Sequence, residues 1–259
     1  MNYLLKRISP TKSHKGATDL NIQFSYKLSR LISGHPLIDV TGALEKEISN
    51  VVYDSRQAEK DCLFAAIPGY RHDGRQFIED AVQRGATAIL TETPLDQLAS
   101  LNLASRNVTA MRVQNCRRAL AFVSAEFYRH PSRALNLVGV TGTNGKTTVT
   151  YLMESIVGAM GEPCGVIGSI NYRYADKIFK SPMTTPEAPD INHMMQAMVD
   201  ESVRWCVVEV SSHSLELHRV RNLDFSVVVF TNLTRDHLDF HGTIENYKQA
   251  KKKLFGDFT

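Results

Sequence analysis

The sequence is poor in cysteine and in long apolar stretches. Its four cysteines, Cys62, Cys116, Cys164 and Cys206, lie far apart and form no C-x-x-C pair. That spacing argues against a disulfide framework or a cysteine-bound metal, and it favours free thiols in a reducing compartment. Apolar runs such as residues 227–230 fall far short of the roughly 20 residues that a membrane-spanning helix needs.

An excess of charge of one sign is also lacking. The chain of 259 residues carries 30 Lys and Arg against 27 Asp and Glu, a formal net charge of +3. A dedicated nucleic-acid binder would usually concentrate basic residues on one face, so we expect no nucleic-acid partner. Lys6 and Arg7 stand where a signal peptide would have its apolar stretch. The sequence therefore predicts a cytoplasmic protein with no membrane partner, and we expect a monomer.

The first half of the chain alternates between strand-like and helix-like segments. Residues 1–27 show no clear period, and we expect a poorly ordered lead-in there. Predicted strands then lie at residues 48–53, 62–67 and 86–90, and predicted helices at residues 75–83 and 117–128. A His130-Pro131 step follows the second helix, which proline cannot continue. We therefore predict an α/β domain over residues 28–132.

The second half has the same character. Predicted strands lie at residues 135–140, 165–170, 205–210 and 225–231, a hairpin at residues 171–180, and helices at residues 146–160, 189–201 and 243–255. Strands separated by helices favour a mostly parallel sheet. We therefore predict a second α/β domain over residues 133–259, with Thr243 as the N-cap of its last helix.

A glycine-rich loop precedes the predicted helix at residues 146–160. It reads Gly142-Thr143-Asn144-Gly145-Lys146-Thr147-Thr148. Glycines let several backbone N–H groups point at one phosphate, and the helix N-terminus adds its positive dipole end. Lys146 would supply positive charge for the outer phosphates, and the Thr147 hydroxyl would bind Mg²⁺. Val140 replaces the first glycine of the common phosphate-loop pattern, so a glycine-rich turn with a chance lysine stays an alternative.

A carboxylate lies near the end of the predicted strand at residues 205–210. Glu209, at the carboxyl end of a core strand and beside a phosphate loop, suits an Mg²⁺ ligand. The alternative is an ordinary strand-end residue that faces water. This segment alone does not decide between the two.

Further potential metal ligands follow the next predicted strand. His237 and His241 are four residues apart and would bind zinc if they shared one helix face. Asp239 and Gly242, however, argue against a regular helix through this stretch. The other interpretation makes His237 a ligand of a second Mg²⁺.

Four separated motifs resemble those of the Mur ligase family, in the same order. They are the block from Asp54-Ser55-Arg56 to His72-Asp73-Gly74, the loop Thr-Gly-Thr-Asn-Gly-Lys-Thr, Glu209-Val-Ser-Ser-His213, and Asn232-Leu-Thr-Arg-Asp-His-Leu-Asp239. The resemblance is to the MurE type and covers about residues 28–255. It implies a small UDP-binding domain followed by a central ATP-binding domain like those of phosphate-loop NTPases.

The activity that this resemblance implies is an ATP-dependent ligation in peptidoglycan synthesis. The D-glutamate carboxylate of UDP-N-acetylmuramoyl-L-alanyl-D-glutamate would first become an acyl phosphate. The amine of diaminopimelate or lysine would then displace phosphate and form an amide. The implied partners are therefore ATP, Mg²⁺, the UDP-linked precursor and an amino acid.

The resemblance also implies roles for individual residues. Catalysis would fall to Lys146, Glu209, His237 and Lys251, and the metal ligands would be Thr147, Glu209, His237 and a carbamate formed on Lys251 from CO₂. The peptide end of the precursor would contact Thr184, Thr185, Ser211 and Arg219, and the UDP end Ser55, Tyr70, Arg71 and His72. A solvated lysine run is the alternative for the segment around Lys251, and a surface salt bridge is the alternative for Arg71. Met183 replaces the asparagine that often precedes the threonine pair.

Ligases of this type continue well past the lysine that matches Lys251, into a third domain that binds the incoming amino acid, whereas this sequence stops at Thr259. We therefore expect a truncated central domain, weak activity at best, and no signal for which amino acid is added. Two other hypotheses stay open: a non-catalytic protein that binds nucleotide or precursor, and another ligase of the superfamily, such as a folylpolyglutamate synthase. The Asp54-Ser55-Arg56 block argues against the latter.

Overall fold

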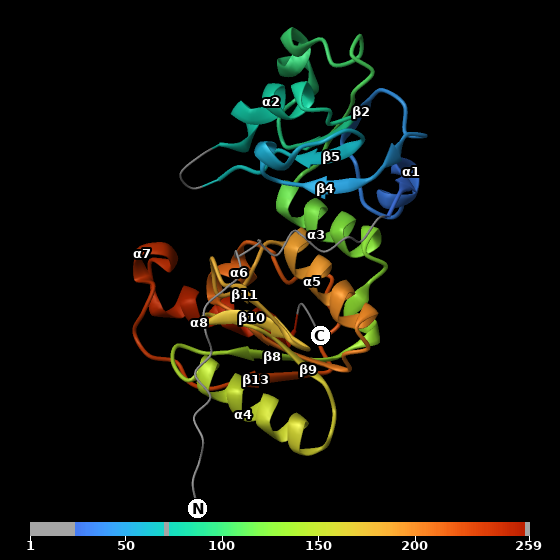
Figure 1. Cartoon of the computed structure of the whole chain (residues 1–259). Helices are drawn as coiled ribbons and strands as arrows, with labels where there is room; N and C mark the ends of the chain where they lie inside the picture. The colour runs from blue at the N-terminus through green and yellow to red at the C-terminus, as the bar shows by residue number, and fades with distance from the viewer. Residues whose placement is uncertain (1–23, 70–72, 257–259) are drawn as a thin grey trace, which may run out of the picture.

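The computed structural model describes residues 24–69 and 73–256. Two large sheets, of five and six strands, and one two-stranded ribbon account for the strands among these residues. In Figure 1 the five-stranded sheet lies above the six-stranded one, and helices α3 (Cys116–Phe127) and α5 (Ala188–Asp200) lie between them. Parallel pairs predominate in both sheets, so the predicted α/β class is confirmed.

The five-stranded sheet has the order β2-β7-β6-β5-β4. Its strands are β2 (Asp39–Thr41), β4 (Asn50–Val52), β5 (Cys62–Ala65), β6 (Ala88–Thr91) and β7 (Thr109–Arg112). All pairs are parallel except that of β2 with β7 at one edge. Every residue of β5 and β6 is buried, because α3 packs on one face and α2 (Ile78–Gln83) on the other.

The N-terminal pieces pack against the core that α3 shares with this sheet. β1 (Tyr26–Lys27) pairs with β3 (Glu47–Ile48), and α1 (Leu28–Leu31) follows β1 directly. The Tyr26 ring packs edge-on against Phe127 of α3, with the ring centroids 5.8 Å apart. The predicted lead-in is therefore too long, since residues 24–27 are part of the fold. Residues 1–23 lie outside the described residues.

A sharp turn leads from the first sheet to the second. Asn115 caps α3 by accepting a hydrogen bond from the Arg118 N–H at 2.9 Å. After α3, Arg129 and His130 both adopt left-handed backbone conformations, with φ of 60° and 54°. A short helical turn, η4 (Pro131–Ala134), then leads into β8 (Asn136–Thr141). We propose that this turn separates the two predicted domains, near residue 132.

The six-stranded sheet has the order β11-β10-β9-β12-β8-β13. Besides β8, its strands are β9 (Cys164–Ile167), β10 (Asn171–Tyr174), β11 (Lys177–Lys180), β12 (Trp205–Glu209) and β13 (Val227–Phe230). β9, β12, β8 and β13 run parallel, and the predicted hairpin is confirmed as antiparallel β10 and β11. The predicted strand over residues 165–170 ends earlier, at Ile167.

Helices cover both faces of the six-stranded sheet. The methionine-rich face of α5 packs with β8, β9 and β12, and Met194, Met195 and Met198 are almost fully buried there. On the other face, α4 (Lys146–Ala159) packs on Val138, Val140 and Val207. Figure 1 shows α4 on the outer side of the sheet, away from α5.

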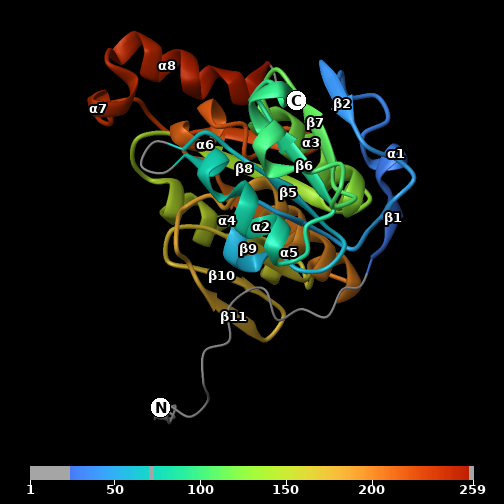
Figure 2. The same cartoon turned by 90° about the horizontal axis from the view of Figure 1, so that it is seen from above.

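The last elements are short helices beside the carboxyl ends of β8, β12 and β13. They are α6 (Ser212–Glu216), α7 (Leu238–His241), α8 (Ile244–Lys252) and η5 (Lys253–Phe255). Thr243 caps α8 as predicted, because its hydroxyl accepts from the Asn246 N–H at 3.1 Å. Figure 2, seen from above, shows α7 and α8 at one edge of the molecule. Parallel strands end at the same edge of a sheet, so these helices border the loops where ligands usually bind.

The four cysteines are free thiols, and Cys62, Cys116 and Cys206 are buried. This agrees with the prediction from their spacing. Within residues 24–69 and 73–256, no helix combines the length and the apolar character that crossing a bilayer requires.

Candidate functional site

The glycine-rich loop joins β8 to α4 in a conformation that needs glycine. Gly142 has a φ of 149°, and a Cβ atom built on it would lie 1.9 Å from the Thr231 hydroxyl oxygen. Gly145 is left-handed, with a φ of 83°, and precedes the first helical residue, Lys146. The loop therefore turns tightly into a helix N-terminus, where free backbone N–H groups favour an anion. Thr147 is half-buried in this first turn, and Thr148 is exposed.

The segment after β13 holds this loop in place. The Thr143 N–H donates to the Asn232 carbonyl at 2.9 Å, and the Asn144 N–H donates to the Asn232 side-chain oxygen at 3.1 Å. The Thr231 hydroxyl donates to the Asn144 carbonyl at 2.6 Å. Two motifs that lie about ninety residues apart in the sequence are thus one structural unit.

Lys146 lies folded over the loop. Its Nζ donates to the carbonyl oxygens of Gly142 and Thr143, both at 2.9 Å. Burial lowers the pKa of Lys146 below its ordinary value, while the nearby carboxylates of Glu209 and Asp236 oppose that shift. A lysine held at the mouth of a phosphate loop is placed to neutralise phosphate charge.

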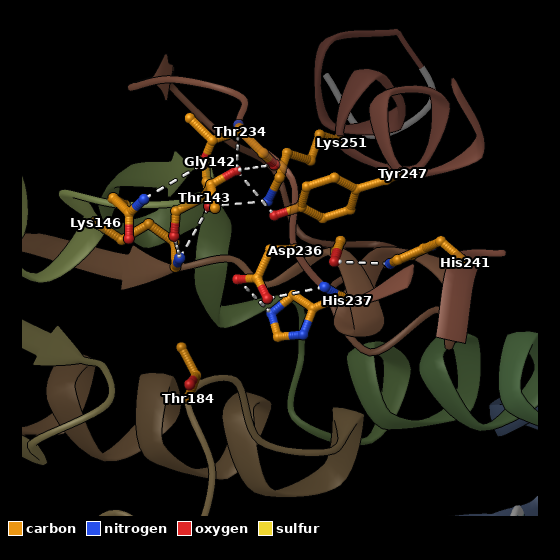
Figure 3. Close-up of polar contacts among 12 residues, drawn as sticks. Gly142, Thr143, Lys146, Thr184, Thr234, Asp236, His237, His241, Tyr247 and Lys251 are labelled. Carbon is orange, nitrogen blue, oxygen red and sulfur yellow. Dashed lines mark hydrogen bonds and ion pairs between the residues drawn. The ribbon is translucent and has the colours of Figure 1, made fainter. Parts of the chain in front are cut away.

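Lys251 reaches the same loop from α8. Its side chain is buried, and its Nζ donates to the Gly142 carbonyl at 2.9 Å, the oxygen that also accepts from Lys146. Burial, and then the charge of Lys146, lower the pKa of Lys251 to about 7. Figure 3 shows the two lysines approaching the loop from opposite sides. The alternative of a solvated lysine run is therefore wrong for Lys251, although Lys252 is exposed.

Sequence reasoning missed Tyr247, which connects Lys251 to the loop. Its ring lies beneath the Lys251 ammonium, with 4.6 Å from Nζ to the ring centroid. Its hydroxyl is 3.1 Å from the Thr143 hydroxyl. Tyr247 precedes Lys251 by four residues, so the helical period places both on one face of α8, and that spacing was a usable signal.

Glu209 is buried at the carboxyl end of β12. Its carboxylate accepts from the Ser169 N–H at 3.2 Å and from the Ser169 hydroxyl at 2.9 Å. A Cβ atom on Gly168 would lie 2.4 Å from Glu209 Oε1, so a larger residue there would displace this carboxylate. The alternative of a strand-end residue facing water is wrong. Ser169 follows the neighbouring strand β9, and nothing local in the sequence pairs it with Glu209.

Histidines gather between α6 and α7. The His237 ring is exposed and packs edge-on against His213, with centroids 4.9 Å apart, and it lies 6.0 Å from Tyr247. Asp236 Oδ2 lies 3.5 Å from His237 Nε2. His237 is therefore near the loop, because its ring lies beside the Tyr247 ring and the Tyr247 hydroxyl lies beside that of Thr143 (Figure 3).

The zinc alternative finds no support in this arrangement. His237 has a φ of 50° and stands before α7, which is a single turn, so it does not share a regular helix face with His241. His241 is buried, and its Nε2 is 2.9 Å from the Ser212 hydroxyl. In the described part of the chain, no three His, Cys, Asp or Glu side chains converge as a zinc site built from them would require.

The residues expected at the peptide end of the precursor form one connected group. The Thr185 hydroxyl donates to the Glu209 carbonyl at 2.7 Å and accepts from the Ser211 N–H at 3.1 Å. Arg219 donates to the Thr185 carbonyl at 3.1 Å. The Thr184 hydroxyl lies 3.1 Å from that of Ser169, and Figure 3 shows Thr184 apart from the two lysines.

The residues expected at the UDP end are only partly described. Ser55 begins the short helix η1 (Ser55–Gln57) and is buried, and its hydrogen bond lowers the pKa of Asp80. Asp54 caps η1 and pairs with Arg56 at 2.6 Å. The other three, Tyr70, Arg71 and His72, lie outside the described residues.

The fold and the site define an α/β protein with a glycine-rich loop between a parallel strand and a helix. The model of the Mur ligase family, catalytic domain, matches residues 47–128, and that of the Mur ligase middle domain matches residues 140–259. Together the two models leave out residues 1–46 and 129–139. The chain belongs to the Mur ligase family.

The similar proteins include ligases named for diaminopimelate. The UDP-N-acetylmuramoyl-L-alanyl-D-glutamate--2,6-diaminopimelate ligase of Caldanaerobacter subterraneus subsp. tengcongensis is 41% identical over 86% of this chain and 43% of its own length. The ligase of that name from Clostridioides difficile is 42% identical over 88% of this chain and 46% of its own. A solved structure of a ligase with this name has a TM-score of 0.73 and 28% identity, covering 90% of this chain and 45% of that one. The chain thus spans less than half the length of these relatives.

Proposed function

We propose that this chain is the precursor- and ATP-binding part of an amide-forming ligase of peptidoglycan synthesis. The reaction would join diaminopimelate or lysine to UDP-N-acetylmuramoyl-L-alanyl-D-glutamate through an acyl phosphate. The observation that carries this proposal is the meeting of Lys146 and Lys251 on the Gly142 carbonyl of the loop. These substrates are metabolites of the cytoplasm, so we place the protein there.

The chain's donors fit a magnesium nucleotide. The loop from Gly142 to Thr148 would hold the phosphates of ATP, with Lys146 neutralising their charge. Thr147, Glu209 and His237 would hold Mg²⁺, which stabilises the charge that develops as phosphoryl transfer proceeds. Glu209 supports this fit, because it is a buried carboxylate whose charge acts on Lys146 of the loop, and a buried anion is stabilised by a bound cation.

A carbamate on Lys251 is the finer part of this proposal. Carbamylation replaces an ammonium with an anionic oxygen ligand, and it begins from the neutral amine. Burial favours the neutral form of Lys251, and the lowered pKa of about 7 agrees with that. Intact-mass analysis in bicarbonate should detect the addition of one CO₂ in the wild type and none in K251M. An unmodified wild-type mass at saturating bicarbonate would contradict the carbamate.

The two ends of the precursor would bind to different sheets. Ser55, which lies beside the five-stranded sheet, would contact the UDP end together with Tyr70, Arg71 and His72. Thr184, Thr185, Ser211 and Arg219 would contact the peptide end, beside the six-stranded sheet. The hydrogen bonds that join Thr185, Ser211 and Arg219 support the second group, because they hold polar side chains close to Glu209.

Precursor binding and phosphate release test the proposal together. The purified chain should bind UDP-N-acetylmuramoyl-L-alanyl-D-glutamate, and with Mg-ATP and diaminopimelate or lysine it should release phosphate slowly. Phosphate release should depend on the precursor and should be lost in K146Q, because that variant lacks the charge that neutralises the phosphates. Binding of neither precursor nor Mg-ATP would contradict the proposal.

A further inference from the structure

We infer that Glu187 is a positioning residue for the peptide end of the precursor. Its carboxylate fixes the guanidinium of Arg219 and joins it to Arg117, which belongs to the helix α3. The inference rests on the proposed function, since it takes Arg219 and Thr185 as precursor contacts. None of the motifs in the sequence pointed to Glu187.

Glu187 is a buried carboxylate held between two arginines. It occupies the N-cap position of α5 and is 7% exposed. One carboxylate oxygen lies 2.9 Å from Arg219 Nε, and the other lies 3.1 Å from Arg117 Nη1. Burying an anion is unfavourable unless it is paired, and here two cations and a helix N-terminus offset that cost. The charge of Glu187 is therefore what keeps both guanidiniums at this place.

Arg219 passes this placement on to the precursor residues. Its Nη1 donates to the Thr185 carbonyl at 3.1 Å, while the Nε–H is not aligned for a hydrogen bond with Glu187. The pairing with Glu187 thus fixes the position of the guanidinium by charge, and Thr185 fixes its direction. Thr185 in turn bonds both Glu209 and Ser211. Side chains that support a binding group in this way set its geometry before the ligand arrives.

The same contact connects the two sheets. Arg117 lies in the second position of α3, whose other face packs on the five-stranded sheet. Close by, the Tyr53 hydroxyl donates at 2.6 Å to Asp190, in the first turn of α5. Tyr53 directly precedes Asp54 and Ser55, the segment expected at the UDP end. The start of α5 therefore receives two polar contacts from the unit that would hold the UDP end.

The variant E187Q separates this role from simple packing. Glutamine keeps the size of the side chain and removes its charge. The two guanidiniums then repel one another without a shared counter-charge, and Arg219 loses its fixed position. Affinity for the dipeptide should fall, because Arg219 must now be ordered when the ligand binds. Contacts to the UDP end should not change.

Calorimetric titration with two ligands measures this difference. The probes are UDP-N-acetylmuramic acid and UDP-N-acetylmuramoyl-L-alanyl-D-glutamate, and the ratio of their Kd values is the gain due to the dipeptide. E187Q should reduce this gain about tenfold, the effect of losing one well-placed charged contact. The matched control is E154Q, which breaks the pairing of Glu154 with Arg173 away from the site and should leave the gain unchanged. Thermal denaturation of each variant shows whether it is folded.

A double variant tests whether Glu187 acts through Arg219. In the background R219Q, the further change E187Q should have no additional effect on the gain. The inference would be overturned if E187Q lowered the gain in the R219Q background as much as it does in the wild type. It would also be overturned if the gain of E187Q alone equalled or exceeded that of the wild type. If E187Q does not fold, E187D, which keeps the charge but shortens its reach, replaces it and should also lower the gain. A wild type that binds neither probe would instead refute the proposed function.

Discussion

At the scale of single residues, Lys251 has the most unusual environment. Burial lowers its pKa to about 7, whereas the unfolded chain keeps that proton up to the ordinary pKa of 10.5. Between these two values the unfolded state binds more protons than the folded state, so stability rises with pH across this window. Below it both states are protonated, and the buried charge lowers stability in full.

The substitution K251M removes the buried charge and keeps an unbranched side chain. We expect the free energy of unfolding to increase by about 1–2 kcal/mol near pH 7 in buffer free of CO₂. The rise in stability between pH 7 and 10 should also become flatter. Urea denaturation at both pH values measures these changes, and K252M, at an exposed lysine, is the control that should show neither. If the stability of K251M rose between pH 7 and 10 as steeply as that of the wild type, Lys251 would not be the source of this pH dependence.

The Tyr53–Asp190 hydrogen bond gives a second pH-dependent prediction. Burial raises the pKa of Asp190 above its ordinary value of 3.8, and the Tyr53 hydroxyl lowers it again. The substitution Y53F should raise that pKa further. A carboxyl group whose pKa is raised in the folded state stabilises the fold below pH 3.8, and that stability is lost as the pH rises through the folded-state pKa. We expect a loss of about 1–2 kcal/mol near pH 7 and a smaller one near pH 4. Chemical denaturation of wild type and Y53F at both pH values measures the two losses of stability. A larger loss at pH 4 than at pH 7 would contradict the prediction.

At the scale of elements, the turn from β8 into α4 depends on one glycine. The variant G142A should lose at least about 2 kcal/mol of stability, because a Cβ atom there meets the Thr231 hydroxyl and the backbone φ is unfavourable. Its affinity for Mg-ATP should fall by about tenfold or more, because the loop N–H groups are displaced. Thermal denaturation and nucleotide titration measure the two effects.

The matched control for that variant is G158A, within α4. A Cβ atom at Gly158 meets nothing within 4 Å, so this change should stabilise the helix by about 0.5–1 kcal/mol. If G142A were as well tolerated as G158A, the tight loop conformation would not be needed for folding or binding.

Elements with a clear period or a local motif could be predicted from the sequence. The helices α4 and α5, the strand β12 and the Thr243 cap all follow from local residue patterns. The ribbon β1–β3 and the strand β2 were missed, since strands of two or three residues are too short to show a period. The four-residue strand β7 was missed as well. The single turn α7 formed where Asp239 argued against a regular helix, because it needs only two i→i−4 bonds, from His241 to His237 and from Gly242 to Leu238.

The site residues also divide into those that a local pattern predicts and those that it does not. The loop and Glu209 could be named from the sequence, because strand-loop-helix order and strand ends are local features. Ser169, which bonds Glu209, and Glu187, which pairs with Arg219, could not. Their contacts depend on which strands are neighbours in the sheet and on how α3 meets α5, and neither is written in any short segment.

At the scale of the whole molecule, the proposed binding residues divide between two sheets. Helices α3 and α5 pack together between those sheets (Figure 1). The Arg117–Glu187 ion pair and the hydrogen bond from Tyr53 to Asp190 cross the same boundary. A precursor that spans this boundary would be held by both units at once. Its binding should therefore stabilise the whole described fold rather than one half of it.

Titration of Mg-ATP into the purified chain tests the nucleotide site most directly. We expect saturable one-to-one binding that requires Mg²⁺, and in K146Q an affinity lower by about tenfold or more. If heat-stable, folded wild-type protein bound no Mg-ATP, or if K146Q bound it equally well, the loop from Gly142 to Thr148 would not be the nucleotide site.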